Sequence, residues 1–202
     1  MRLAFIILSH KNPQQLCRLL SRLQHPAIDC YVHLDAKAEI NDWQEAMNMP
    51  QVYFIGKRVN VTWAGYGTIQ AALNGISAIA ETGQTYGFIH LISAQDYPLV
   101  EMNLFHDFFS AHAGQQFLDL LPPQELRRVM SKITSFHFED LQLPGKYTLT
   151  AWLNKILPKR KHPLKLEVYG GSLWWSLTQE CADWCLEYVN AHPELESFYK
   201  YT

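Results

Sequence analysis

The chain has 202 residues and a formal net charge of −2, a size that one domain with a single sizeable core can reach. Hydrophobic residues make up 48% and charged residues 18% of the sequence, which excludes a disordered chain, and the slightly acidic balance argues against a nucleic-acid partner. Aromatic residues reach 13%, which suits either a large core or stacking against a sugar or base.

Neither a secretion signal nor a membrane span is expected. The apolar run that begins at Leu3 ends at Leu8, which is too short for either. Cys181 and Cys185 lie four apart on a predicted helix without two further ligands nearby, so we interpret them as buried, reduced thiols. We therefore expect a cytoplasmic protein with no transmembrane segment and no metal held by these cysteines.

The opening of the chain predicts a strand, a helix and a second strand. Residues 3–8 are apolar on both faces, as in a strand covered by helices on each side. Asn12 and Pro13 are typical of an N-cap and the first helical position, and leucines spaced at i, i+3, i+4 and i+7 follow them. The next strand, at 30–34, ends at Asp35. This order predicts a parallel pair with a right-handed crossover.

Strands and helices continue to alternate up to about residue 121. A weak helix at 43–47 leads to a strand at 52–55, and residues 69–80 have the clearest helical periodicity in the chain. A buried strand at 88–92, a helix at 104–109 and a strand at 116–121 follow. This alternation predicts an α/β fold with a mostly parallel central sheet flanked by helices.

The pattern loosens between residues 122 and 163, where prolines recur and basic residues alternate with aromatic ones. A short helix is predicted at 149–157 and a longer one at 178–191. The basic run 159–162 predicts a solvated loop or, alternatively, an anion site. Because loops on a rigid scaffold usually set specificity, part of this region should contact a ligand. The side chains expected to do so, or else to form a solvated helix face, are Arg127, Arg128 and Lys132.

Polar side chains follow three of the predicted strands, at residues 9–11 (Ser-His-Lys), 33–37 (His-Leu-Asp-Ala-Lys) and 93–96 (Ser-Ala-Gln-Asp). The carboxyl ends of parallel strands meet at one edge of a sheet, so we expect these groups to converge and to be able to hold a base and a ribose. No G-x-G-x-x-G, P-loop, H-E-x-x-H, G-x-S-x-G or nucleophilic cysteine motif is present. Asp96 is equally explained as a residue that only closes a turn.

Two aromatic segments have two interpretations each. Residues 61–67 place Trp63 and Tyr66 among small residues before a helix, which predicts either a flat apolar surface for a ligand or a hydrophobic staple. Residues 170–175 follow a glycine pair with Trp174 and Trp175, which predicts either a sugar platform or a tight turn with core tryptophans.

Five motifs occur in a characteristic order: Ile7 to Lys11, Tyr31 to Lys37, Trp63 to Tyr66 with Gln70 and Asn74, Ser93 to Leu99, and Gly171 to Thr178. Together they resemble the core-2/I-branching β-1,6-N-acetylglucosaminyltransferase family, which includes the peptide O-xylosyltransferases. The resemblance implies a GT-A-like nucleotide-sugar-binding fold. It also implies inverting, metal-independent transfer of a sugar, GlcNAc or alternatively xylose, from a UDP-sugar to a glycan or peptide hydroxyl. A catalytically incomplete module that binds a UDP-sugar or a glycan is the alternative from another class.

The resemblance also assigns site residues by motif position. Asp96 stands where many GT-A enzymes carry a metal-binding D-x-D, but Ala94 occupies the first position of the triplet. No cofactor is therefore expected, and basic side chains must offset the charge of the departing diphosphate. The implied donor-binding residues are Ile7, Leu8, Ser9, Asp35, Ala36, Lys37, Trp63 and Asp96. The implied sugar or acceptor platform comprises Gly171, Ser172, Trp174 and Trp175.

The sequence departs from the family pattern at its end. The implied general base is a Glu in a Pro-Asp-Glu-like stretch, which we expect beyond Thr202, so no catalytic residue is expected in this chain. Glu194 and Glu196 do not match that motif. We expect one GT-A-like domain over 1–202, with a nucleotide-binding half at 1–121 and an acceptor-side half at 122–202 that is incomplete at its C-terminus.

Overall fold

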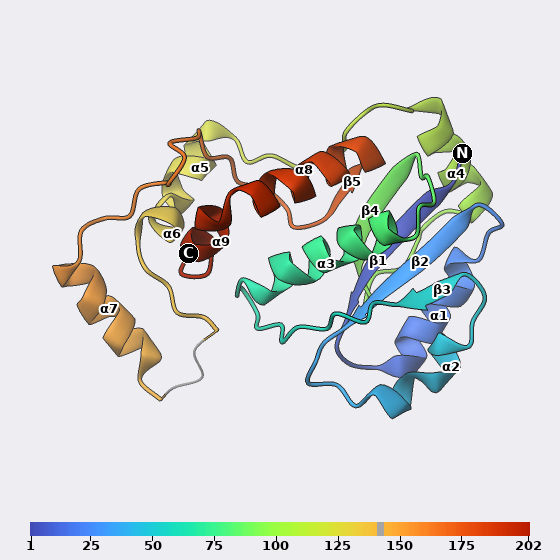
Figure 1. Cartoon of the computed structure of the whole chain (residues 1–202), viewed down its shortest axis with the longest axis horizontal. Helices are drawn as coiled ribbons and strands as arrows, with labels where there is room; N and C mark the ends of the chain where they lie inside the picture. Colours follow the sequence, from blue (N-terminus) through green and yellow to red (C-terminus); the bar gives the residue numbers. More distant parts are fainter. Residues whose placement is uncertain (141–143) are drawn as a thin grey trace.

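The computed structural model describes residues 1–140 and 144–202 and is built around one five-stranded sheet (Figure 1). The strand order is β3-β2-β1-β4-β5, with β1, β2, β3 and β4 parallel and β5 antiparallel to β4. The strands are β1 (Leu3–Ser9), β2 (Ile28–Leu34), β3 (Val52–Phe54), β4 (Phe88–Ser93) and β5 (Trp175–Leu177). The predicted α/β fold with a mostly parallel sheet is confirmed.

Helices cover both faces of this sheet. Helices α1 (Pro13–Leu23), α2 (Gln44–Met47) and α4 (Met102–Ala111) pack on one face, and α3 (Gly67–Glu81) and α8 (Gln179–Ala191) on the other (Figure 1). Successive side chains of a strand point to opposite faces, so β1 sends Leu3, Phe5 and Ile7 toward the first group and Ala4 and Ile6 toward the second. A strand buried on both faces must be apolar at every position, as predicted for 3–8.

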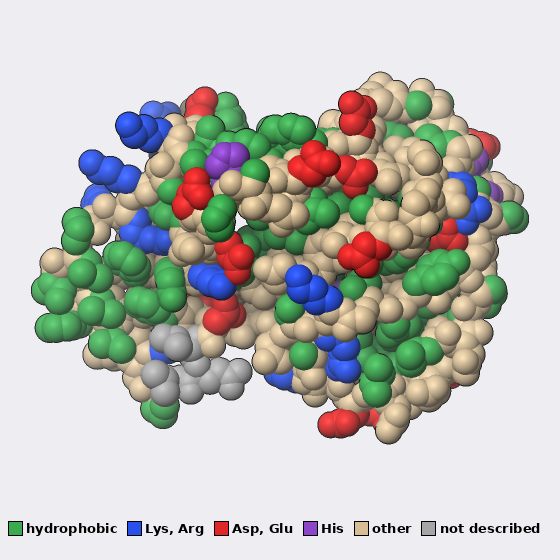
Figure 2. Space-filling model, in the orientation of Figure 1, with side chains coloured by type: hydrophobic (Ala, Val, Ile, Leu, Met, Phe, Trp, Pro, Cys, Tyr) green, Lys and Arg blue, Asp and Glu red, His purple; other side chains and the backbone are tan. Residues whose placement is uncertain are grey.

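The remaining helices lie to one side of the sheet. They are α5 (Pro123–Val129), α6 (Ser131–Thr134), α7 (Lys146–Ile156) and α9 (Pro193–Tyr199), and a 3₁₀ turn, Ile40–Trp43, precedes α2 (Figure 1). Figure 2 shows Lys and Arg side chains gathered at this end of the molecule. Residues 141–143 of the predicted loose region lie outside the described residues. None of the described helices combines the length and the apolarity needed to cross a bilayer.

The basic run 159–162 does not form the purely solvated loop that was one of its two predicted interpretations. Arg160 is partly buried and donates to the main-chain oxygens of Phe198 and Tyr201, the latter at 2.5 Å. Carbonyls at a helix C-terminus lack partners within the helix, which explains why a cation is held at the end of α9. Lys159 and Lys161 remain exposed.

Three further local predictions are corrected. The predicted strand at 116–121 forms only two isolated bridges, Phe117 to Ser176 and Leu120 to Gly171, because the segments advance by unequal numbers of residues between them. Asn12 is the N-cap of α1 and Pro13 its first residue, as predicted, but Asn12 lies in the left-handed region, at φ 59°, and its side chain makes no capping bond. Cysteines 181 and 185 are half-buried rather than buried, although all four cysteines are free.

His90 in β4 is a deeply buried titratable ring of the sheet. It is 1% exposed, lies 4.7 Å from the Phe5 ring and 4.5 Å from the Phe109 ring, and places Nδ1 2.7 Å from Ser176 Oγ. Burial lowers the pKa of His90 to about 3. The ring is therefore neutral in the folded protein.

The free energy of unfolding should decrease as the pH is lowered below 6.5, because buried His90 stays neutral in the folded protein. In the unfolded chain the imidazole titrates near 6.5, so as the pH falls below that value the unfolded state takes up a proton that the folded state excludes. The contribution of neutral His90 is complete above pH 6.5 and is lost toward pH 3. The expected slope is about 1.4 kcal/mol per pH unit. Urea unfolding of the protein and of His90→Gln from neutral pH to about pH 5 measures it. Equal slopes would contradict the prediction.

Gly75 allows α3 to lie close to β1. A Cβ at this position would come within 2.6 Å of Cγ2 of Ile6, which is itself fully buried. Gly75→Val should therefore lower the free energy of unfolding by about 2 kcal/mol or more. The matched control is Ala80→Val on the exposed side of the same helix, which should cost only about 0.5 kcal/mol of helix propensity. Similar losses in the two variants, measured by urea denaturation, would rule out the close packing.

Candidate functional site

A cavity of 510 Å³, called here the edge cavity, opens at the carboxyl ends of the parallel strands. Ser9 ends β1, Asp35 follows β2 and Ser93 ends β4, and all three line the cavity. The parallel register places Leu8 beside His33 on one side and beside Ser93 on the other. The predicted convergence of three polar strand ends is therefore what the structure contains.

The segment 57–61 forms one side of this region and is held against the end of β2. Arg58 donates through Nε to the Leu34 carbonyl at 3.0 Å and through Nη2 to the Asp35 carbonyl at 2.7 Å. The Asn74 side chain of α3 donates to the Lys57 carbonyl at 2.9 Å. This stretch belongs to no strand, so its main-chain groups are satisfied by side chains and by main-chain bonds such as that from the Ala36 N–H to the Val59 carbonyl at 3.1 Å.

Asp35 is 3% exposed, and its carboxylate also holds the segment 57–61 in place. Its Oδ1 accepts the Lys37 main-chain N–H at 2.9 Å, and its Oδ2 accepts the Val61 N–H at 3.2 Å. Lys37 Nζ lies 3.5 Å from Oδ2 and donates to the Val61 carbonyl at 2.7 Å. Asp35 thus lines the cavity and also fixes the segment that shapes it.

His33 and Ser9 line the edge cavity, and each has a buried polar atom without a partner in the described part of the chain. The Val59 N–H donates to His33 Nε2 at 3.1 Å, which leaves the ring proton on Nδ1. Burial lowers the pKa of His33, an effect that Asp35 opposes and Arg58 reinforces, so the ring is neutral at neutral pH. His33 Nδ1 and Ser9 Oγ are buried without a partner among the described residues. Buried polar groups of this kind ordinarily have partners, so a ligand or water should supply them.

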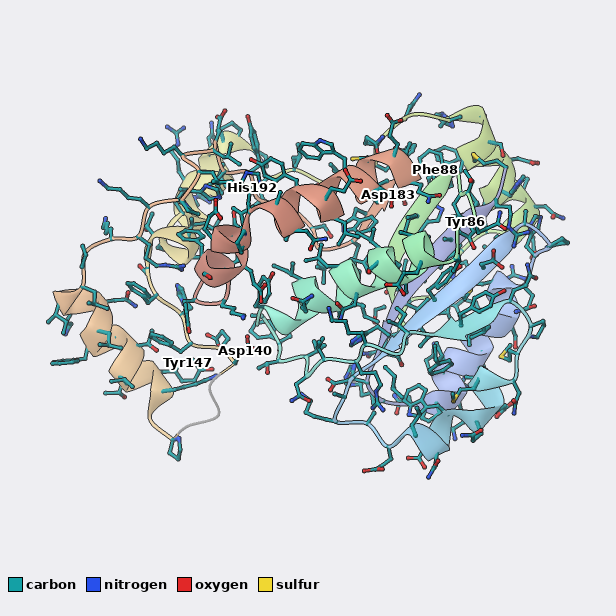
Figure 3. All side chains as sticks on the ribbon, in the orientation of Figure 1. Tyr86, Phe88, Asp140, Tyr147, Asp183 and His192 are labelled. Carbon is teal, nitrogen blue, oxygen red and sulfur yellow. The ribbon has the colours of Figure 1, made fainter. Side chains whose placement is uncertain are left out.

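Trp63 stands on the rim of the cavity with 92% of its surface exposed. A hydrophobic staple would bury this side chain, so the structure favours the flat apolar surface. Gly65, two residues further on, lies against the Asp140 carboxylate, whose Oδ2 accepts the Tyr66 N–H at 3.2 Å. Asp140 lies near the N-terminal end of α3 (Figure 3).

Other predicted donor residues lie elsewhere. Ile7 is 0% exposed and points into the core, because the alternation of β1 directs it there. Ala36 and Lys37 are exposed and are not among the residues that line the edge cavity. Asp96 is exposed and closes the turn after β4, with Oδ2 accepting the Ser93 N–H at 2.7 Å. A direct donor contact by these four residues stays a prediction.

Asp96 instead lines a second cavity of 670 Å³, called here the apolar cavity. Tyr97, Phe105 and Phe117 contribute to its walls, and Trp175 does as well. Trp174 lines both cavities, so the two are neighbours. Two of the four residues of the predicted platform, Trp174 and Trp175, therefore line a cavity. Gly171 pairs with Leu120, and Ser172 Oγ accepts the Trp174 N–H at 3.2 Å, so these two shape the turn.

Sequence reasoning missed part of the edge cavity. The sequence predicts His33 at a strand end, but the structure adds that it lines the cavity and that its Nδ1 has no partner among the described residues. Thr68, Ile69 and Leu173 also line the cavity, and no motif singled them out as site residues. The available signal for Ile69 was its place at the start of the helical pattern at 69–80. Over residues 1–140 and 144–202, no group of three or more His, Cys, Asp or Glu side chains could hold a metal ion.

A mostly parallel sheet with one antiparallel edge strand, and a polar cavity at the carboxyl ends of its strands, is the arrangement of a GT-A-like glycosyltransferase fold. The sequence model of the Core-2/I-branching enzyme family matches residues 3–201. The chain belongs to this family, and the resemblance stated from the motifs is confirmed.

Curated relatives are similar at low identity. A human protein named probable beta-1,3-galactosyl-O-glycosyl-glycoprotein beta-1,6-N-acetylglucosaminyltransferase 7 is 23% identical over 200 residues, covering 96% of this chain and 45% of its own length. The xylosyltransferase oxt of Drosophila melanogaster is 22% identical, covering 88% of this chain and 20% of its own. The beta-glucuronosyltransferase GlcAT14A of Arabidopsis thaliana is 24% identical, covering 92% and 43%. The chain thus spans less than half the length of these relatives.

Trp63 offers a direct test of the edge cavity. Loss of a stacking indole costs about 1–3 kcal/mol per base, so Trp63→Ala should weaken binding of UDP, the nucleotide implied by the resemblance, by about tenfold. Thermal stability should not change, because the side chain is almost fully exposed. Trp184→Ala, at a 60% exposed position on α8, is the control for removing a surface tryptophan. Equal effects of the two variants in calorimetric titration would contradict this placement.

Proposed function

We propose that this chain holds the donor site of an inverting glycosyltransferase that moves a sugar from a UDP-sugar to a hydroxyl of a glycan or peptide. The observation that carries the proposal is the convergence of Ser9, Asp35 and Trp63 on one cavity at the sheet edge. The motif resemblance implies a donor role for all three. At 510 Å³, the cavity is within the usual range for small-molecule sites.

The edge cavity has suitable chemistry for a nucleoside. The Trp63 indole offers a face for a base to stack on, while the neutral His33 offers an N–H donor and Ser9 a hydroxyl. A pyrimidine such as uracil presents carbonyl acceptors and one N–H, which can match these groups. Asp35 contributes mainly by holding the 57–61 segment in place.

Two adjoining cavities suit a transfer between two substrates. We propose that the donor occupies the edge cavity and the acceptor the apolar cavity, with Trp174 between them. In inversion, the acceptor oxygen forms its bond to C1 as the bond from C1 to the UDP oxygen breaks, and a carboxylate base takes the hydroxyl proton. Holding both substrates in line supplies much of the rate. We assign no base among the described residues.

Metal independence is part of the proposal. Ala94 takes the first position of the D-x-D triplet and is 3% exposed, and one oxygen of Asp96 is engaged by the Ser93 N–H. This leaves no pair of carboxylates at that position to bind a cation. None of the described residues that line the edge cavity is Lys or Arg. A basic group outside that set would therefore offset the charge of the diphosphate.

The transferred sugar is proposed to be GlcNAc, with xylose as the second candidate. Relatives named for GlcNAc transfer and for xylosyl transfer match nearly the whole chain at 23% and 22% identity. Comparing UDP-GlcNAc with UDP-xylose in binding and in turnover separates the two. A protein that binds both and transfers neither would favour the binding module.

Calorimetric titration with UDP in EDTA tests the proposed function. UDP should bind without metal, and ADP should bind at least about tenfold more weakly, because polar groups fitted to one base are left unpaired by another. A dependence on added Mn²⁺ or Mg²⁺ would contradict metal independence. Equal affinity for ADP, or no binding of either nucleotide, would refute the uridine site. Trp63→Ala and Trp184→Ala are the matched variants for this titration.

A further inference from the structure

Charge is distributed very unevenly along the chain. Residues 126–166, called here the basic lobe, contain nine of the 17 Lys and Arg residues but only two of the 19 Asp and Glu residues. The chain as a whole carries a net charge of −2, so the part outside the lobe is strongly acidic. The lobe comprises the end of α5, all of α6 and α7, and the loop after α7 (Figures 1 and 2).

Most of these positive charges have no internal role. Lys146 pairs with Glu139 at 3.2 Å, and Arg160 holds the end of α9. The other seven side chains are exposed, and none forms an ion pair with a residue in the described parts of the chain. They are Arg127, Arg128, Lys132, Lys155, Lys159, Lys161 and Lys165.

Helix α7 carries an apolar face that no described residue covers. Leu149, Trp152 and Ile156 follow one another at i, i+3 and i+7, so they share one side of the helix, and they are 47%, 58% and 59% exposed. The opposite side is fixed by Asn154, which exchanges hydrogen bonds of 2.7 and 2.8 Å with the main chain of Phe136. The apolar side is therefore held outward by these bonds.

We propose that the basic lobe docks on an anionic lipid bilayer, with the apolar face of α7 in the interface and the surrounding lysines at the lipid phosphates. An amphipathic helix with tryptophan and aliphatic residues on one side, and Lys on the other, binds a bilayer through buried apolar area and attraction to anionic lipid. Each Lys or Arg near such a surface contributes about 1 kcal/mol.

Charge complementarity favours an anionic bilayer as the partner and determines which end of the protein faces it. An anionic surface attracts the lobe and repels the acidic remainder of the chain, so one end of the molecule would face the bilayer. A soluble polyanion would engage the lysines but leave Trp152 and Ile156 in water. No residue of the lobe that the structure describes lines the edge cavity, so the proposal is independent of the proposed donor site.

Vesicle co-sedimentation of the full chain tests the proposal. The protein should bind vesicles of equimolar phosphatidylcholine and phosphatidylglycerol, bind phosphatidylcholine alone weakly, and lose affinity as salt is added. Trp152→Ser with Ile156→Ser should weaken binding to the anionic vesicles by at least about tenfold, because both side chains lose apolar area. Lys155→Glu with Lys159→Glu should weaken it by about tenfold or more.

Matched controls come from outside the lobe. Leu104→Ser replaces a 63% exposed leucine on α4, and Arg18→Glu reverses an exposed charge on α1. Both should bind the anionic vesicles as the unaltered protein does, and circular dichroism should show that every variant is folded.

Three results would overturn the proposal. The first is equal binding to the two kinds of vesicle. The second is binding to soluble dextran sulfate with no binding to anionic vesicles, which would assign the lobe to a polyanion. The third is a Trp152→Ser/Ile156→Ser variant that changes from dimer to monomer in light scattering while no protein binds vesicles, which would assign α7 to self-association.

Discussion

The shape of the edge cavity depends on the buried carboxylate of Asp35. The segment 57–61 has no strand beside it, yet its main-chain groups lie against the end of β2, where each unpaired group would cost about 1–3 kcal/mol. Asp35 accepts the Val61 N–H, and His33 accepts the Val59 N–H. These two acceptors satisfy the segment's N–H groups, while Arg58, Asn74 and Lys37 add further bonds that hold it there. The same interactions fix the His33 tautomer, so the structural bonds also decide which polar atom remains for a ligand.

The sheet and its principal helices were predictable from the sequence because their patterns are set by burial. A strand with helices on both sides must be apolar throughout, as β1 is, and α3 shows its buried side in the spacing of its apolar residues. The segment 116–121 has a similar composition but pairs with 171–176 at only two points. Whether a run forms a regular ladder depends on its partner's register, which the run itself does not encode.

The site was predicted in part, for a related reason. Parallel topology forces strand ends together, so Ser9, Asp35 and Ser93 had to meet at one edge. Side-chain direction was harder to predict: Ile7 shares a motif with Ser9 but is buried in the core, and Asp96 bends back to bond Ser93. Trp63 could be assigned only by its 92% exposure, because small neighbours and a following helix also describe a staple. The contribution of 57–61 depends on long-range bonds that no local pattern reveals.

Relatives of this chain are named for transfer of different sugars, although they match nearly the same span. In the function we propose, the edge cavity binds the nucleoside, the part of the donor that different nucleotide sugars can share. Differences in sugar and acceptor are then better sought in the apolar cavity, whose walls come from the turn after β4, the irregular pairing near Phe117, and the two tryptophans before and within β5. Irregular backbone of this kind tolerates substitution more readily than a buried parallel strand does. Trp174 lines both cavities, so a substitution there would alter the proposed acceptor site and the proposed donor site together.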